Sequence, residues 1–124
     1  MKRRLRWGFL GTSFISGVMA NAVRAEGSTV VHSVAGRSAD SARGFARKYE
    51  IDNASDDYDA LIDDEGVDIV YIALPNHLHH RYVVRAAAAG KAILCEKSLS
   101  VDMEKSRRAL AAVEQNQVFF AEGL

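Results

Sequence analysis

The ten residues from Trp7 to Ser16, WGFLGTSFIS, decide the fold of this chain. The apolar run from Leu5 to Leu10 predicts a buried strand, and Gly11 ends it in a turn that opens onto a helical pattern from Phe14 to Ala25. The first turn of a helix presents unpaired backbone N–H groups and the positive end of the helix dipole. This junction therefore predicts an anion site that suits a phosphate.

The junction is an incomplete dinucleotide fingerprint. Such a fingerprint places glycine at three positions, for the tight turn, for the approach of the pyrophosphate and for helix packing. Those positions hold Gly11, Ser13 and Ser16, so only the first is a glycine. Taken alone, the motif fits a plain turn between a strand and a helix as well as it fits a nucleotide site.

Composition limits the class of protein. The 124 residues are enough for one domain with a real core, 48% of them are apolar and the formal net charge is zero. These values exclude a disordered chain and give no electrostatic footprint for nucleic acid. The single cysteine, Cys95, excludes an internal disulfide and fits a reducing compartment. We expect Cys95 to be a packed core thiol, because no base lies beside it in sequence.

The N-terminus resembles a signal peptide, because Lys2, Arg3 and Arg4 precede an apolar stretch. Glycine, serine and threonine interrupt that stretch six times, and its removal would delete the first strand, so we reject this interpretation. No run reaches the roughly 18 apolar residues of a membrane span. We expect a cytoplasmic protein with no membrane partner.

Strand and helix patterns alternate along the whole chain. The predicted strands are 5–10, 29–35, a short edge strand within 51–55, 68–74, 92–95 and 118–121. The candidate N-caps of the helices between them are Ser38 or Asp40, Asp56 or Asp57, and Ser100 or Asp102. The candidate helix stops are Gly27, Gly66 and Gly90. Short connections and right-handed crossovers predict an α/β fold, a doubly wound parallel sheet of about six strands with helices on both faces.

Ligands bind such sheets outside the carboxyl ends of the strands, where the strand order reverses. Four stretches should gather at that edge: Gly11–Phe14, Gly36–Ser38, Pro75–His79 and Glu96–Ser98. After the second strand, an acid usually binds the ribose of NAD, whereas an arginine meets the 2′-phosphate of NADP. The sequence has Arg37 and no acid there, which favours NADP; the alternative is a solvated loop charge.

Two further groups at strand ends have competing interpretations. His77, His79 and His80 suggest zinc, but no cysteine or carboxylate follows at ligand spacing, so we expect no metal. A histidine in that loop can instead bond ribose or substrate. Lys97 can orient a substrate hydroxyl or carbonyl and assist proton transfer, with Glu96 positioning it. From spacing alone, an ordinary surface pair is favoured for Glu96 and Lys97.

Together these residues resemble the Gfo/Idh/MocA family of NAD(P)-dependent oxidoreductases, most closely the branch of glucose-fructose oxidoreductase and dimeric dihydrodiol dehydrogenase. The matching phrases keep the family's order and spacing and are 6–12 (RWGFLGT), 58–61 (YDAL), 67–79 (VDIVYIALPNHLH), 89–97 (AGKAILCEK) and 120–124 (FAEGL). The resemblance implies a Rossmann domain that binds NADP or NAD over residues 1–124.

The resemblance also implies roles for individual residues. The phosphates would be lined by Gly11, Thr12, Ser13, Phe14 and Ile15. Arg37 and Ser38 would meet the adenosine ribose or its 2′-phosphate. The adenine, ribose and nicotinamide portion would be bordered by Leu74, Pro75, Asn76 and His79, with Glu96 beside it. Lys97 corresponds to the lysine of the family's Glu-Lys-Pro motif, which faces substrate and nicotinamide, and is the candidate catalytic residue.

Three departures from the family limit this comparison. Ser13 replaces the second glycine, which narrows the backbone's approach to the pyrophosphate, although its hydroxyl can bond a phosphate oxygen. Ser98 replaces the proline that sets the lysine's turn, often through a cis bond that costs roughly 3 kcal/mol before serine. The family's second, substrate-binding domain is absent from this chain, which is either a piece of a longer protein or a naturally short protein that has lost catalysis.

The expected function is the nucleotide-binding half of an oxidoreductase that transfers a hydride between a nicotinamide cofactor and a sugar, polyol or related alcohol or carbonyl compound. Its partners are the dinucleotide and, only with the second domain, a small-molecule substrate. The alternative is a non-catalytic Rossmann module that binds NAD(P) or self-associates as a homo-oligomer.

Overall fold

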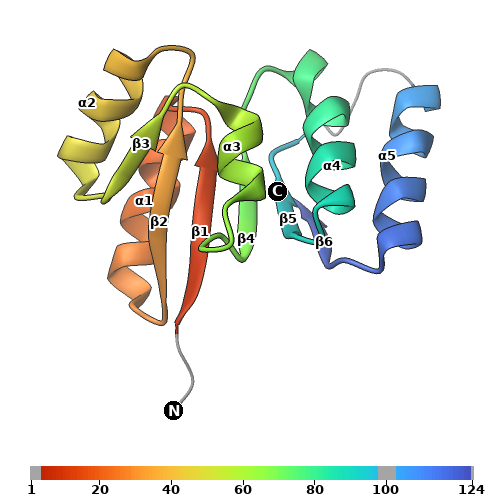
Figure 1. Ribbon diagram of the computed structural model, residues 1–124, viewed down its shortest axis with the longest axis horizontal. Coiled ribbons are helices and arrows are strands. Elements are labelled where there is room, and N and C mark those ends of the chain that lie inside the picture. Colours follow the sequence, from red (N-terminus) through yellow and green to blue (C-terminus); the bar gives the residue numbers. More distant parts are fainter. Residues whose placement is uncertain (1–3, 98–102, 124) are drawn as a thin grey trace.

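The computed structural model describes residues 4–97 and 103–123, and within them six strands alternate with helices (Figure 1). The strands are β1 (Leu5–Leu10), β2 (Thr29–Ala35), β3 (Asn53–Ser55), β4 (Ile69–Ile72), β5 (Ala92–Cys95) and β6 (Phe120–Glu122). The helices are α1 (Phe14–Glu26), α2 (Ala39–Tyr49), α3 (Tyr58–Asp63), the 3-10 helix η1 (Asn76–Leu78), α4 (His79–Ala88) and α5 (Met103–Asn116).

All six strands are parallel and form one sheet in the order β3-β2-β1-β4-β5-β6. The chain builds outward from β1 to β3, then returns to the centre and builds outward again from β4 to β6. The reversal lies between β1 and β4, where Leu10 is in register with Ile72. The predicted doubly wound parallel sheet is therefore confirmed, and its switch point is at the β1–β4 pair.

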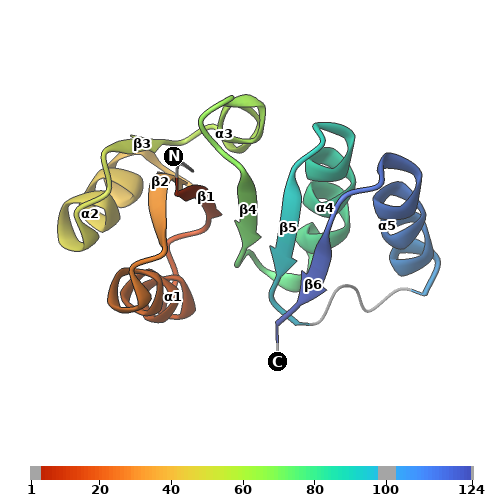
Figure 2. The same cartoon turned by 90° about the horizontal axis from the view of Figure 1, so that it is seen from below.

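Helices cover the two faces of the sheet in separate groups (Figure 2). Helices α1 and α2 pack on β2 and β3 around an apolar cluster that includes Phe9, Val34, Phe45 and Tyr71. Helices α3, α4 and α5 lie on the opposite face, over a second cluster that includes Ile72. The sheet therefore separates two apolar layers, as expected for strands whose residues are buried on both faces.

Strand β4 explains why the sheet is stable at its centre. Val70, Tyr71 and Ile72 are completely buried, and burying a large apolar side chain stabilises a fold by about 1.5–3 kcal/mol. The strand is shorter than the predicted 68–74. Asp68 lies just before it, where its carboxylate accepts a hydrogen bond from the backbone N–H of Arg6 at 2.8 Å.

Most predicted helix boundaries are confirmed. Ser38 caps α2 and Asp57 caps α3 through their side-chain oxygens, and Gly27 follows α1 with a left-handed φ of 83°. Gly90 follows α4 with φ 76°. The predicted stop at Gly66 is wrong: α3 ends at Asp63, because Asp64 turns the chain and its carboxylate accepts the Gly66 N–H at 2.7 Å. The caps predicted at Ser100 or Asp102 lie outside the described residues.

The last strand begins two residues later than predicted. The expected strand covered 118–121, whereas β6 covers Phe120–Glu122. Val118 instead lies in the turn that follows α5, where its N–H donates to the carbonyl of Val113 at 3.3 Å. The carboxyl ends of β1, β2, β4, β5 and β6 nevertheless meet along one edge of the sheet, which positions the candidate site.

Candidate functional site

A cavity of about 660 Å³ opens at the carboxyl edge of the sheet, beside the switch point. Four segments that follow strands form its wall, and they come from β1, β2, β3 and β4. The lining residues are Gly11, Thr12, Ser13, Gly36, Arg37, Asp56, Tyr58, Ala73, Leu74, Pro75, His77 and Leu78. The predicted gathering of the first three loops at one edge is therefore confirmed.

Gly11 forms the tight turn at the floor of this cavity. Its φ is +108°, a conformation that side-chain-bearing residues rarely adopt, and a Cβ there would lie 2.6 Å from the carbonyl oxygen of Ala73. Its N–H donates to the carbonyl of Ala35 at 2.9 Å, which ties the turn to the end of β2. Only glycine fits where β1, β2 and β4 meet.

The start of α1 faces the same cavity. Ser13 is the N-cap of the helix, and its Oγ accepts a hydrogen bond from the Ser16 N–H at 3.5 Å. The backbone N–H groups of Phe14 and Ile15 lie in the first turn of the helix, where no preceding helical carbonyl can accept their hydrogen bonds. The side chains of Phe14 and Ile15 are exposed. A helix start of this kind suits an anion, and binding of a phosphate there stays a prediction.

The close-packing glycine is Gly17 rather than the residue at position 16. A Cβ on Gly17 would overlap the hydroxyl group of Tyr49, which ends α2. Ser16 is fully buried, and its hydroxyl lies 3.3 Å from that of Ser13. The sequence pattern did not indicate this role; the available signal was a glycine one position beyond the expected place in a helical pattern.

Arg37 leaves the end of β2 as an exposed cation at the cavity wall. Across residues 4–97 and 103–123, no hydrogen bond or ion pair engages its guanidinium group. Ser38 is different, because its Oγ accepts the Ser41 N–H at 3.1 Å and Ser41 bonds back to the Ser38 N–H at 3.4 Å. This reciprocal capping box engages the Ser38 hydroxyl at the start of α2.

The loop after β4 provides the apolar wall. Leu74 and Pro75 line the cavity, whereas Asn76 is exposed and begins η1. His79 is 1% exposed, and its Nε2 donates to the carbonyl oxygen of Leu74 at 2.6 Å. His77 lines the cavity and His80 is half-buried on α4, so the three histidines have three different environments.

Asp56 and Tyr58 complete the cavity and were not predicted to belong to a site. The Tyr58 ring packs edge-on against Tyr82, with ring centroids 5.3 Å apart. Burial raises the pKa of the Tyr58 hydroxyl, and the charge of Arg37 partly offsets this shift. The usable signal was their position, since they follow β3, and the neighbouring strand β2 leads into the loop that holds Arg37.

Glu96 and Lys97 follow β5, one strand beyond the lined cavity. The Glu96 carboxylate accepts a hydrogen bond from the Tyr71 hydroxyl at 2.7 Å, while Lys97 is exposed. Cys95 is completely buried, as predicted, and burial raises the pKa of its thiol to about 12. Ser98 lies outside the described residues.

Neither a metal-binding group nor a membrane-spanning helix is found in residues 4–97 and 103–123. Its histidine, cysteine, aspartate and glutamate side chains form no group of three or more that is placed to hold a metal ion. Among the described helices, none combines the length and the apolar character needed to cross a bilayer.

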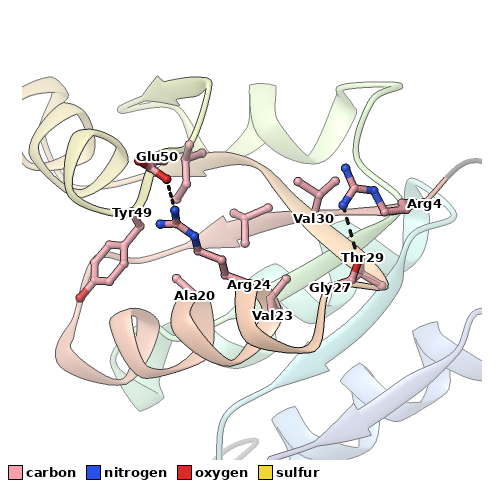
Figure 3. Close-up of a pocket in the computed structure, with 11 residues that line it drawn as sticks. Arg4, Ala20, Val23, Arg24, Gly27, Thr29, Val30, Tyr49 and Glu50 are labelled. Atoms are coloured by element: carbon pink, nitrogen blue, oxygen red, sulfur yellow. Dashed lines mark hydrogen bonds and ion pairs between the residues drawn. The ribbon is translucent and has the colours of Figure 1, made fainter.

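A smaller hollow of about 200 Å³ lies at the opposite edge of the sheet, where β2 begins (Figure 3). Val23 and Ala20 of α1 form part of its apolar wall, and the ion pair between Arg24 and Glu50 bridges α1 and the end of α2. The ends rather than the starts of α1 and α2 face this hollow, so their dipoles disfavour an anion there. The larger cavity is the better candidate for a nucleotide.

Comparisons with known proteins agree with this geometry. Residues 5–124 match the model of the Gfo/Idh/MocA oxidoreductase family, described as an NAD-binding Rossmann fold. The chain is 41% identical over 108 residues to the uncharacterized oxidoreductase ORF334 of Rhizobium meliloti, covering 86% of this chain and 32% of that protein. It is 33% identical over 122 residues to the trans-1,2-dihydrobenzene-1,2-diol dehydrogenase of Sus scrofa, covering 97% of this chain and 36% of the enzyme.

A solved structure extends the likeness to three dimensions. The crystal structure of KijD10, a 3-ketoreductase from Actinomadura kijaniata in complex with NADP and TDP-benzene, superposes with a TM-score of 0.89 at 31% identity. The match covers 97% of this chain and 37% of KijD10. The chain thus spans about a third of the length of the proteins that it matches.

Proposed function

The chain belongs to the Gfo/Idh/MocA family of oxidoreductases, with the NAD-binding Rossmann fold of that family, and from this membership we propose its function. It is the dinucleotide-binding part of an oxidoreductase that transfers a hydride between a nicotinamide cofactor and a sugar, polyol or related alcohol or carbonyl compound. The names of two similar proteins, a diol dehydrogenase and a 3-ketoreductase, support this substrate class.

The observation that carries the proposal is the cavity at the switch point, which meets the start of α1. Gly11 lets the backbone approach a ligand closely, and the N–H groups at the helix start suit a pyrophosphate. The adenosine half then lies over the end of β2, near Arg37 and Tyr58. The opposite half extends over β4 toward Lys97 at the end of β5.

The residues present fit this cofactor. Gly36 also lines the cavity, and its backbone passes close to the start of α2. A Cβ at this position would lie 2.8 Å from the Ser41 Oγ. When bound, the nicotinamide ring supplies the hydride chemistry. The residues of this chain bind the phosphates, orient the ring and hold Lys97 at the strand end, where its ammonium group can orient a substrate oxygen or assist proton transfer.

NADP is the proposed cofactor, and Arg37 is the reason. Its guanidinium group is exposed at the cavity wall, so it is available to bond a 2′-phosphate bidentately. The NADP bound to KijD10 adds support from a similar structure. Asp56 lines the same cavity, and its negative charge favours the unphosphorylated ribose of NAD. In this proposal the charge of Arg37 outweighs that of Asp56 at the ribose, and the cofactor is NADP.

Titration with NADPH and with NADH, followed by nicotinamide fluorescence, tests the proposal directly. We expect saturable binding of both and tighter binding of NADPH. Competition by 2′,5′-ADP identifies the adenosine end, because this fragment occupies only that half of the site. Failure of both dinucleotides to bind would refute the oxidoreductase function and any role as an NAD(P) sensor.

A non-catalytic, self-associating module is the second candidate. Phe14 is 87% exposed and Val18 46% exposed, one turn apart on α1, and exposed apolar residues gathered on one helix face are typical of interaction surfaces. Sedimentation velocity over a range of concentrations distinguishes the two functions. Concentration-dependent dimerisation without dinucleotide binding would favour the module.

A further inference from the structure

The hydroxyl of Tyr71 reaches across the sheet to the carboxylate that precedes Lys97. Tyr71 lies in the middle of β4 and is completely buried, and its oxygen donates to Glu96 Oε2 at 2.7 Å. Its ring packs against Phe9, with ring centroids 4.9 Å apart, and meets Trp7 edge-on at 6.4 Å. Apolar packing therefore fixes the direction of the hydroxyl group.

Glu96 is held from several sides at once. Its backbone N–H donates to the carbonyl of Ile72 at 2.9 Å. The Gly123 N–H donates to the carbonyl of Cys95 at 2.6 Å, and a Cβ on Gly123 would come within 2.9 Å of Glu96 Oε1. The ends of β4, β5 and β6 thus surround Glu96, and the next residue in the chain is Lys97.

We propose that Tyr71 is a positioning residue, which acts through Glu96 to fix the turn that presents Lys97 to the nicotinamide half of the cofactor. This inference rests on the proposed function. The hydrogen bond from a buried hydroxyl to a carboxylate is of the charge-assisted kind, which is stronger than a neutral one. Without it, the half-buried Glu96 side chain must find another partner, and the strand-end turn loses its constraint.

The position of Glu96 explains why a change at Tyr71 should affect the binding of only one half of the cofactor. Glu96 and Lys97 follow β5, whereas Arg37 and Tyr58 belong to the β2 and β3 side of the cavity. Strands β1 and β4 separate the two groups in the sheet. A change at Tyr71 should therefore reach the nicotinamide half and spare the adenosine half.

Calorimetric titration of Tyr71→Phe with NADPH, NADH and 2′,5′-ADP tests the inference. We expect a loss of affinity of up to about tenfold for both dinucleotides, because the free energy of this one internal charge-assisted hydrogen bond is the most that its removal can transfer to binding, and a change within about twofold for 2′,5′-ADP. Thr29→Val is the control, since it removes the hydrogen bond that Thr29 Oγ1 accepts from Trp7 Nε1 at 2.8 Å, at the opposite edge of the sheet from Glu96. It should bind all three ligands like the parent chain.

A double-mutant cycle shows whether Tyr71 acts through Glu96. Tyr71→Phe combined with Glu96→Ala should be no weaker than Glu96→Ala alone, because both changes remove the same constraint. Additive losses, equal losses for dinucleotide and fragment, or unchanged affinity in Tyr71→Phe would each overturn the inference. Absence of dinucleotide binding by the parent chain would instead refute the proposed function on which the inference rests.

Discussion

A hydrogen bond joins His79 to Leu74: the Nε2 of this buried histidine lies 2.6 Å from the leucine carbonyl oxygen. His79 is the first residue of α4, and Leu74 belongs to the loop that lines the cavity after β4. A helix residue thereby holds the shape of the apolar wall. Direct contact of His79 with the cofactor stays a prediction, whereas its contact with the loop is a feature of the fold.

Replacing His79 by leucine should lower both stability and cofactor affinity. The change leaves the Leu74 carbonyl without its donor, which should reduce the free energy of unfolding by about 1–3 kcal/mol. Denaturant unfolding and nicotinamide fluorescence measure the two effects. His80→Leu is the control, because His80 is half-buried on the same helix turn. A stability loss with unchanged dinucleotide affinity would contradict a role for the His79–Leu74 hydrogen bond in binding.

Replacing Arg37 by alanine should weaken NADPH binding far more than NADH binding. The proposed bidentate contact with the 2′-phosphate contributes about 1.5–3 kcal/mol, so a tenfold or larger loss is expected for NADPH alone. Arg43→Ala provides the control, since Arg43 is an exposed arginine on α2 that pairs with Asp40 at 2.5 Å. Equal losses for the two dinucleotides would refute the NADP assignment.

The 124 residues by themselves should bind dinucleotide but catalyse hydride transfer slowly or not at all. In the proposed mechanism, water exclusion and substrate orientation come from the second domain of the family. Nicotinamide absorbance in the presence of sugars, polyols and their carbonyl counterparts measures turnover. Robust dehydrogenase activity would overturn the expectation, and loss of that activity in Lys97→Met would then establish the lysine as the catalytic residue.

Cys95 should make the stability of the fold sensitive to alkaline pH. Burial raises the pKa of its thiol from 9.0 to about 12, so the unfolded chain releases this proton at lower pH than the folded chain. The stabilising contribution is complete below about pH 9 and falls as pH rises toward 12. Denaturant unfolding of Cys95→Ala should lack this part of the decline. An identical pH profile in both proteins would contradict the prediction.

The fold could be predicted from the sequence because its determinants are local. The continuous apolar run of β4 marks a central strand, and Gly11, Gly27 and Gly90 mark the places where the backbone takes positive φ. Capping residues lie within a few positions of the helices that they begin. Such signals need no knowledge of which strands are neighbours.

The rest of the site could not be predicted, because it depends on contacts between distant segments. Tyr58 enters the cavity because β3 pairs with β2, and the Tyr71–Glu96 bond joins residues 25 positions apart. Ser13 illustrates a different limit. The sequence suggests a hydroxyl for a phosphate oxygen, and the structure shows a second role that it did not suggest: the Ser13 oxygen accepts a hydrogen bond as the cap of α1, which leaves its O–H able to donate.

The strand order has a consequence for how a ligand acts on the whole molecule. Within the sheet, strands β1–β3 and β4–β6 form two halves that pair along β1 and β4, and the cavity spans this seam. A dinucleotide bound there would contact residues of both halves. It binds only when they are joined, so saturation at a hundred times the Kd should add about 2.7 kcal/mol to the free energy of unfolding. The cofactor would then be a structural component of the domain as well as its chemical reagent.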